Sequence, residues 1–261
     1  MRFGYCCAPA QTGILKAAGF DYFEWSVPGL LMPLADDAVF ENALAEANAA
    51  ALPCEALNVM VPGELKITGP AVGTSALRGY LEVAFPRARQ LGAEVIVFGS
   101  GGARGVPHGF PMDAAWRQIA DFLRLCEPIA AAHDIVIAIE PLRRAECNII
   151  NYVSEAVALA AIINLPHIGA LGDTHHMNCG REPIEALALA GGSLRHVHVS
   201  RSLGDAGRVF PAHEDGEDYK ALFDILKASG YQGKVSVEAS CEDFARDGAR
   251  AAAVLTNAMR D

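Results

Sequence analysis

Residues 135–144 read IVIAIEPLRR. Five apolar residues, from Ile135 to Ile139, lead directly into Glu140, and Pro141 follows. Pro141 ends regular structure because it has no backbone N–H to donate. A short apolar run bounded by such a breaker is typical of a strand that is buried on both faces. A carboxylate at the end of a buried strand requires a reason, and the same arrangement recurs later in the chain.

Short apolar runs alternate with longer amphipathic segments along the whole sequence. We predict strands at residues 2–6, 20–25, 54–59, 94–99, 135–140, 168–173, 195–200 and 234–239. Apolar residues at helical spacing predict helices at 11–18, 36–51, 75–91, 113–132, 153–163, 183–191, 218–229 and 241–259. Strands separated by helices form right-handed βαβ units with a parallel sheet. Eight such units predict one α/β domain over residues 1–261, a closed (β/α)8 TIM barrel with its active site at the C-terminal ends of the strands.

The composition argues against several classes of protein. The formal net charge is −10, whereas a nucleic-acid-binding protein needs an excess of Lys and Arg to displace counterions. No apolar run approaches the ~20 residues that span a membrane. The start MRFGYCCAPAQ lacks the basic and long apolar regions of a signal peptide, so we expect none. The seven cysteines include no CxxC pair, which in a chain of this size indicates reduced thiols in the cytoplasm.

Two loops rich in glycine and proline follow predicted strands, at residues 61–73 and 99–111. The second begins GSGGARG (99–105), and a glycine-rich loop of this kind can bind phosphate. This segment lacks both the Lys-Ser/Thr pair of a P-loop and the GxGxxG spacing. Two interpretations stay open, phosphate binding and shaping of the backbone beside the active site.

Four consecutive strands, from the fifth to the eighth, carry side chains at their ends that bind metals or transfer protons. Glu140 ends the fifth, Asp173 the sixth and Glu238 the eighth, while the seventh carries His196 and His198. Each has a simpler explanation on its own, since an acidic residue after a strand often caps the next helix. Because the C-terminal ends of barrel strands meet at one mouth, we expect a single shared site. The two histidines lie on one face of their strand, so we expect one in the site and the other behind it.

A divalent metal ion is the expected cofactor of this site. Three carboxylates at an apolar mouth would repel one another, and some would stay protonated without a cation. Three carboxylates and one imidazole form an oxygen-rich ligand set that suits Mn²⁺ or Mg²⁺, with Co²⁺ and Zn²⁺ as alternatives. A structural zinc site would contain more cysteine or histidine. We therefore expect one divalent ion, with Mn²⁺ preferred.

These motifs resemble those of the sugar isomerase/epimerase superfamily of xylose isomerase-like TIM barrels, and most of all the ketose 3-epimerases of the tagatose and psicose type. Four segments carry the resemblance: EPLRRAECNIIN (140–151), DTHHMN (173–178), RHVHVS (195–200) and KVSVEAS (234–240). The resemblance implies that Glu140 and Glu238 are the catalytic acid and base. It also implies that Glu140, Asp173, His198 and Glu238 bind the metal, and that Glu146 and His176 bind the substrate.

The sequence departs from the epimerase pattern after the seventh strand. The epimerases follow their His-x-His segment with a Glu and then Asn-Arg, and that Arg contacts both the substrate and a catalytic Glu. Here Arg201 lies where the Glu is expected, and Gly204 lies where the Arg is expected. We expect Arg201 or Arg208 to bind the substrate in place of the missing Arg, unless the substrate itself differs. Four arginines are expected near the mouth, where they either bind an anionic group of the substrate or stay solvated: Arg143, Arg144, Arg201 and Arg208.

The resemblance implies a divalent-metal-dependent isomerase or epimerase that acts on a ketose or related keto-sugar through an enediolate, with two glutamates as acid and base. An inosose-type dehydratase and a hydroxypyruvate-type isomerase are alternatives on the same barrel. An endonuclease IV-like nuclease is a remote alternative, because eight histidines and a net charge of −10 offer few zinc ligands and no phosphate track. A sugar-binding protein without catalysis is equally remote, since binding needs no opposed carboxylates. We expect a small sugar as the partner, no nucleic acid or membrane, and a homo-dimer or homo-tetramer.

Overall fold

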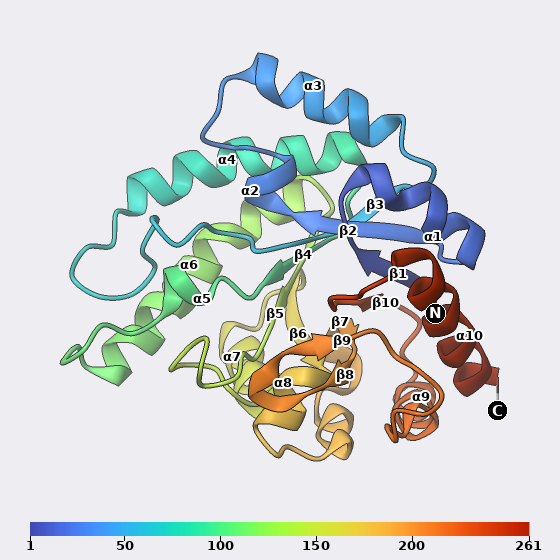
Figure 1. Cartoon of the computed structure of the whole chain (residues 1–261). Coiled ribbons are helices and arrows are strands. Elements are labelled where there is room, and N and C mark those ends of the chain that lie inside the picture. The colour runs from blue at the N-terminus through green and yellow to red at the C-terminus, as the bar shows by residue number, and fades with distance from the viewer. Residues whose placement is uncertain (261) are drawn as a thin grey trace.

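The computed structural model describes residues 1–260, and its central feature is a closed parallel barrel (Figure 1). Eight strands form the barrel in the order β1-β10-β7-β6-β5-β4-β3-β2, and β1 pairs with both β10 and β2 to close it. Their bounds are β1 Arg2–Cys6, β2 Tyr22–Ser26, β3 Cys54–Asn58, β4 Val95–Phe98, β5 Val136–Ile139, β6 Ile168–Asp173, β7 Leu194–Val199 and β10 Lys234–Val237. The predicted (β/α)8 barrel is therefore confirmed.

Long helices cover the outside of the barrel in Figure 1. They are α1 Thr12–Ala18, α3 Asp37–Asn48, α4 Thr74–Leu91, α6 Met112–Ala132, α7 Val153–Ile163, α9 Tyr219–Ala228 and α10 Phe244–Arg260. Gly19 and Gly92 end α1 and α4 in the left-handed region, with φ of 98° and 84°. Both positions carry the glycine that such a helix end favours. The predicted boundaries of these helices hold to within about three residues, the scatter expected at helix ends.

The helix predicted at 183–191 is replaced by shorter elements. After β6 the chain forms α8, Thr174–Cys179, and then the 3-10 helices η2, Ile184–Leu189, and η3, Gly191–Ser193. Pro183 precedes η2 and Gly191 follows it, so little chain remains for a full α-helix. The segment also lies very close to the sheet, because a Cβ on Gly172 would be 2.1 Å from Leu187 Cδ2. The prediction of a regular helix here was wrong.

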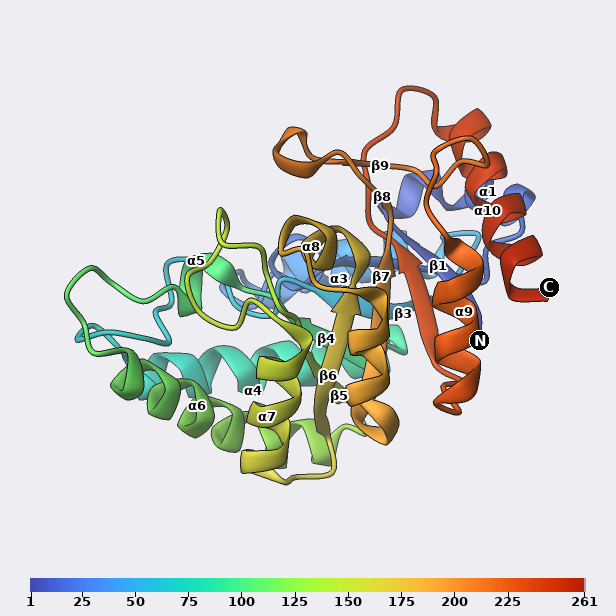
Figure 2. The same cartoon turned by 90° about the horizontal axis from the view of Figure 1, so that it is seen from below.

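Several short elements lie beyond the C-terminal ends of the strands and were not predicted. They include α2 Val27–Leu30, α5 Gly101–Arg104, and a hairpin made of β8 Arg201–Ser202 and β9 Arg208–Val209. The 3-10 helix η4, Gly204–Ala206, forms the hairpin tip, and η1, Pro9–Gln11, precedes α1. Figure 2 shows the hairpin on the same side of the barrel as α5 and α8. This side is where a barrel of this class builds its active site.

The barrel interior is filled by a small set of inward-facing side chains, separate from the larger core between sheet and helices. The apolar members of this set are Tyr22, Ala56, Val95, Val97, Ala138 and Leu171. The Tyr22 ring fits because Gly4 has no side chain; a Cβ there would lie 2.2 Å from the ring. The Tyr22 hydroxyl and Ser236 Oγ are 2.8 Å apart across the interior. The interior is therefore packed, and a ligand can enter only at the mouth.

None of the helices within residues 1–260 is both long and apolar enough to cross a membrane.

We predict that Phe223→Ala lowers the free energy of unfolding by about 3–5 kcal/mol, because it leaves a cavity between α9 and the barrel. Phe223 is fully buried, and its ring lies edge-on to Phe3 of β1 at a centroid distance of 5.7 Å. Urea denaturation measures the change. Leu189→Ala is the control, since Leu189 is 62% exposed and should cost little. Equal effects of the two substitutions would contradict this account of the core.

Candidate metal centre at the barrel mouth

Four side chains from consecutive strands of the barrel meet at its mouth. Glu140 follows β5, Asp173 ends β6, His198 lies in β7 and Glu238 follows β10. One donor atom from each lies within 4.8 Å of the others. His198 Nδ1 is 3.1 Å from Glu140 Oε1, 3.7 Å from Asp173 Oδ2 and 2.9 Å from Glu238 Oε2. The convergence expected from the strand ends is present, and we call these four residues the donor cluster.

Local sequence explains how two of the carboxylates are placed. A Cβ on Gly99 would lie 2.2 Å from Glu140 Oε2, so glycine at this position leaves room for the carboxylate. Asp173 is the N-cap of α8, and its Oδ1 accepts the backbone N–H groups of His175 and His176 at 2.7 and 3.1 Å. Its second oxygen remains directed to the donor cluster. Asp173 therefore caps a helix and contributes to the cluster at the same time.

Glu24 orients His198, and sequence reasoning did not assign it this position. The Glu24 carboxylate is fully buried inside the barrel, with Oε1 3.0 Å from His198 Nε2 and Oε2 2.8 Å from His196 Nε2. Ser236 Oγ also donates to Glu24 Oε2, at 2.7 Å. His198 thus directs Nε2 to Glu24 and Nδ1 to the donor cluster, the arrangement common for metal-binding histidines. His196 is the histidine behind the site. The sequence signal that could have revealed Glu24 is an acidic residue within the apolar strand β2, Tyr22–Ser26.

The environment shifts the pKa values of the three carboxylates of the cluster in different directions. Burial raises the pKa of Glu140. Burial acts the same way on Asp173, but His176, Arg208 and His198 together outweigh it and hold the pKa of Asp173 below its usual range. Burial also acts to raise the pKa of Glu238, but His198 and Arg208 together outweigh it and lower that pKa. The cluster concentrates negative charge in a buried place, which a bound cation would offset.

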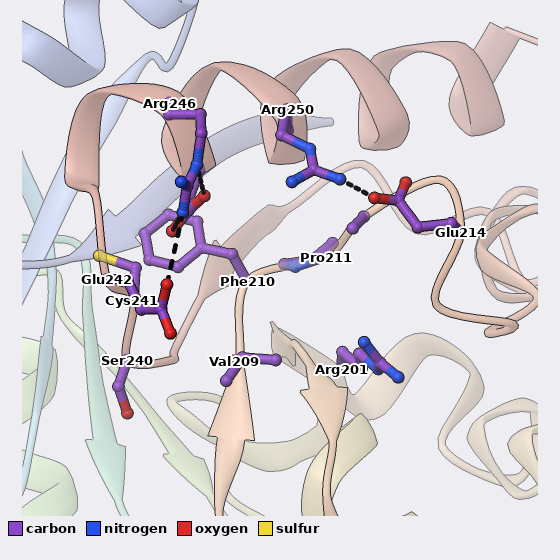
Figure 3. Close-up of a pocket in the computed structure, with 12 residues that line it drawn as sticks. Arg201, Val209, Phe210, Pro211, Glu214, Ser240, Cys241, Glu242, Arg246 and Arg250 are labelled. Carbon is purple, nitrogen blue, oxygen red and sulfur yellow. Dashed lines mark hydrogen bonds and ion pairs between the residues drawn. The ribbon is translucent and has the colours of Figure 1, made fainter.

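The β8–β9 hairpin carries both arginines that were predicted to approach the site, Arg201 and Arg208, and places them differently. Arg208 reaches the cluster from β9: Nη1 is 2.7 Å from Asp173 Oδ2, and Nη2 is 2.9 Å from Glu238 Oε2. Arg201 lies on β8 and lines a separate cavity of about 210 Å³ with Phe210 (Figure 3). No ion pair or hydrogen bond joins Arg201 to the donor cluster among residues 1–260. Arg208, and not Arg201, is therefore brought to the site.

His176 and Glu146 lie on the β5–β6 side of the cluster. His176 Nδ1 accepts the backbone N–H of Arg143 at 3.2 Å, so its proton is on Nε2. That Nε2 is 3.9 Å from Glu140 Oε1 and 4.0 Å from Glu146 Oε2. Glu146 is half-exposed, and its Oε1 accepts from Arg143 Nε at 2.6 Å. Arg144 lies over the Tyr152 ring instead. Both predicted substrate-binding residues therefore border the mouth.

A cavity of about 330 Å³ opens on the opposite side of the cluster, at the ends of β1, β2 and β3. Arg208 and Glu238 form the wall nearest the cluster, and the remaining lining is uncharged: Cys6, Trp25, Ser26, Asn58, Ala239 and Ser240. This cavity is distinct from the cavity of Figure 3, and the two have one lining residue in common, Ser240. The Ser240 N–H donates to the Arg208 carbonyl of β9 at 3.2 Å. The mouth therefore has an open, uncharged extension next to Glu238.

The donor cluster suits a divalent ion. It offers three carboxylate oxygens and one imidazole nitrogen, all buried or nearly so, with the imidazole already oriented by Glu24. A hard, oxygen-rich set of this kind favours Mn²⁺ or Mg²⁺. Two further groups have ligand-type atoms close together, Cys6 with Glu24 and His198, and Glu146 with His175 and His176. The first reuses the nitrogen that orients His198, and the second has His176 Nδ1 bonded to the backbone.

Comparison with known proteins finds several related sequences. A 3-dehydro-D-guloside 4-epimerase of Escherichia coli is 33% identical over 128 residues, which are 49% of this chain and 47% of that protein. An L-ribulose 3-epimerase of Mesorhizobium japonicum is 26% identical over 70% of this chain and 61% of that protein. The chain thus spans about half to three fifths of the length of these two relatives.

Solved structures match over nearly the whole chain. A 3-keto-D-glucoside 4-epimerase from Escherichia coli in its apo form has a TM-score of 0.80 at 24% identity, with 98% of this chain and 99% of that chain covered. A D-psicose 3-epimerase with D-tagatose from Clostridium cellulolyticum has a TM-score of 0.79 at 18% identity, with 100% and 98% covered. At these identities the likeness shows the fold. The family model described as xylose isomerase-like TIM barrel matches residues 13–258. The resemblance inferred from the motifs is confirmed, and the chain belongs to the xylose isomerase-like TIM barrel family.

Proposed function

We propose that this protein is a divalent-metal-dependent epimerase or isomerase of a keto-sugar, acting through an enediolate. One observation carries the proposal: Glu140 and Glu238 approach the same buried cluster from β5 and β10, which β6 and β7 separate in the barrel. Two carboxylates that reach one site from separate strands can act on different faces of a substrate. The sequence relatives named as sugar epimerases support the choice of reaction.

The chemistry requires removal of a weakly acidic proton next to a carbonyl. Glu140, Asp173, His198 and Glu238 would hold the metal, which when bound supplies Lewis-acid polarisation of the carbonyl and an adjacent hydroxyl. One glutamate takes the proton from one face of the substrate carbon, and the other returns a proton to the opposite face. Inversion of the carbon follows when the two steps use different glutamates. Buried carboxylates in fixed positions suit this exchange.

The surrounding residues would orient the sugar. His176 carries its proton on Nε2, on the side of Glu140 and Glu146, so it can donate to a substrate oxygen there. Arg208 is the cation next to Glu238, and we propose that it contacts the substrate oxygen closest to that glutamate. The rest of the sugar would extend into the uncharged cavity beside Trp25 and Asn58. Arg208, the cation in the wall of this cavity, is already paired with Asp173 and Glu238, which favours a substrate without a phosphate group.

We predict that Glu238→Gln abolishes turnover, with a loss of about 10²–10⁴-fold or more, because the amide cannot accept the proton. The measurement is incorporation of deuterium from the solvent next to the carbonyl, read by NMR for a panel of free ketoses and keto-glycosides. Glu242→Gln is the control, since the Glu242 side chain is 95% exposed. Full activity of Glu238→Gln would refute the assignment. Loss of water from a keto-inositol, without inversion, would favour the dehydratase alternative.

We predict that Arg208→Met lowers kcat/KM by about 10²-fold, the cost typical of removing one donor from a charged reaction site. Arg201→Met should stay close to the wild-type value, because Arg201 lines the separate cavity of Figure 3 and forms no hydrogen bond or ion pair with the donor cluster among residues 1–260. Steady-state kinetics on the substrate found in the panel measures both. A larger loss in Arg201→Met than in Arg208→Met would reverse the assignment of the two arginines.

A further inference from the structure

Arg104 is a fully buried cation that the proposed reaction does not use. It is the last residue of α5, within the GSGGARG segment (99–105), and its exposed fraction is 0%. Its guanidinium has no carboxylate within ion-pair distance among residues 1–260. Nη1 donates to the Phe98 carbonyl at 2.6 Å, Nη2 donates to the Glu140 carbonyl at 2.5 Å, and Nε is buried without a partner.

This placement is costly for stability. Arginine is almost never fully buried unless it is paired, because the charge loses its hydration. Two carbonyls and the Phe98 ring, 5.2 Å from the guanidinium carbon, offset only part of that loss. No carboxylate partner within ion-pair distance among residues 1–260 offsets the rest, which points to a specific task for the two carbonyl contacts.

The two carbonyls bound by Arg104 identify the task. The pairing of β4 with β5 ends at Phe98 and Ile139, and the next residue is Glu140 of the donor cluster. Pro141 has no N–H, so the sheet cannot continue past Glu140. The Phe98 carbonyl accepts the Glu140 N–H at 3.2 Å and also Arg104 Nη1. Arg104 thus joins the Phe98 carbonyl, which accepts the Glu140 N–H, to the carbonyl of Glu140 itself, at the point where the hydrogen-bond ladder of the strands ends.

We propose that Arg104 is a positioning residue for Glu140, and that its guanidinium fixes the Glu140 backbone so that the carboxylate meets the other three donors of the metal site. This inference rests on the metal site of the proposed function. It also gives the GSGGARG segment its role: Gly99 leaves space for the Glu140 carboxylate, and Arg104 holds the main chain that carries it.

The guanidinium is specifically suited to this role. Its planar fork presents two N–H groups to two carbonyls at once, which the single ammonium of lysine cannot reproduce in a fixed geometry. The guanidinium also places a positive charge next to the main chain of Glu140, a member of the donor cluster. Lysine would keep that charge and lose the bridge, whereas methionine would lose both.

The test compares Mn²⁺ binding by the wild-type chain, Arg104→Met, Arg104→Lys and the matched control Arg87→Met. Arg87 is also a buried arginine whose guanidinium donates to main-chain carbonyls, those of Leu31 and Met32 at 2.8 and 2.7 Å. It lies on α4, close to Asp37 at the start of α3, and contacts no member of the donor cluster. Calorimetry of the metal-free proteins gives the affinity, the Mn²⁺ EPR spectrum reports the ligand geometry, and thermal unfolding reports stability.

We expect Arg104→Met to bind Mn²⁺ about 10–100-fold more weakly than the wild type, the usual effect of removing a group that orients a metal ligand. Arg104→Lys should also bind more weakly and show an altered EPR spectrum. Arg87→Met should lose stability and keep the wild-type affinity. If Arg104→Met folds and binds Mn²⁺ with the wild-type affinity, the inference is overturned. If Arg104→Met does not fold, wild-type affinity in Arg104→Lys overturns it. A wild-type chain that binds no Mn²⁺ would instead refute the metal site of the proposed function, and this inference with it.

Discussion

Three carboxylates and one imidazole share a buried place at the mouth of the barrel, and much of the surrounding structure depends on the resulting concentration of negative charge. Like charges in a medium of low dielectric constant are unfavourable unless a cation or proton offsets them. Arg208 supplies one positive charge from the hairpin, through contacts with Asp173 and Glu238. The four donor atoms lie close enough together to hold a further cation.

Three of the four donors are fixed by contacts that also serve the fold. Glu24 binds two histidines inside the barrel and turns the Nδ1 of His198 outward. Asp173 caps α8 with one oxygen and keeps the other for the cluster. Glu140 follows β5 and precedes Pro141. Gly99 leaves space for its carboxylate, and Arg104 donates to its carbonyl. Fixed ligands of this kind lower the reorganisation needed when a metal or substrate binds.

The sequence alone was sufficient for the barrel and for the cluster, because both follow from a repeated local pattern. Each parallel strand is an apolar run, and every strand end lies at the same mouth, so Glu140, Asp173, Glu238 and one histidine of the seventh strand could be placed together without knowing any contact. The choice of His198 as that histidine came from the family resemblance. Other features depend on contacts between distant segments. Whether Arg201 or Arg208 reaches the site is set by a hairpin of two short strands, which has no periodic signal. Glu24 bonds to residues more than 170 positions away, and Leu187 packs on Gly172 too closely for the regular helix that its pattern indicated.

The most direct test of the central claim is the metal content per chain, measured by elemental analysis after loading with Mn²⁺ and removal of unbound ion. The account predicts a single Mn²⁺ per chain, and its loss in Asp173→Asn, in which the carboxylate is removed but the α8 cap can persist. No retained ion in the wild-type chain would contradict the account. Several zinc ions per chain would also contradict it, because the cluster provides ligands for a single ion.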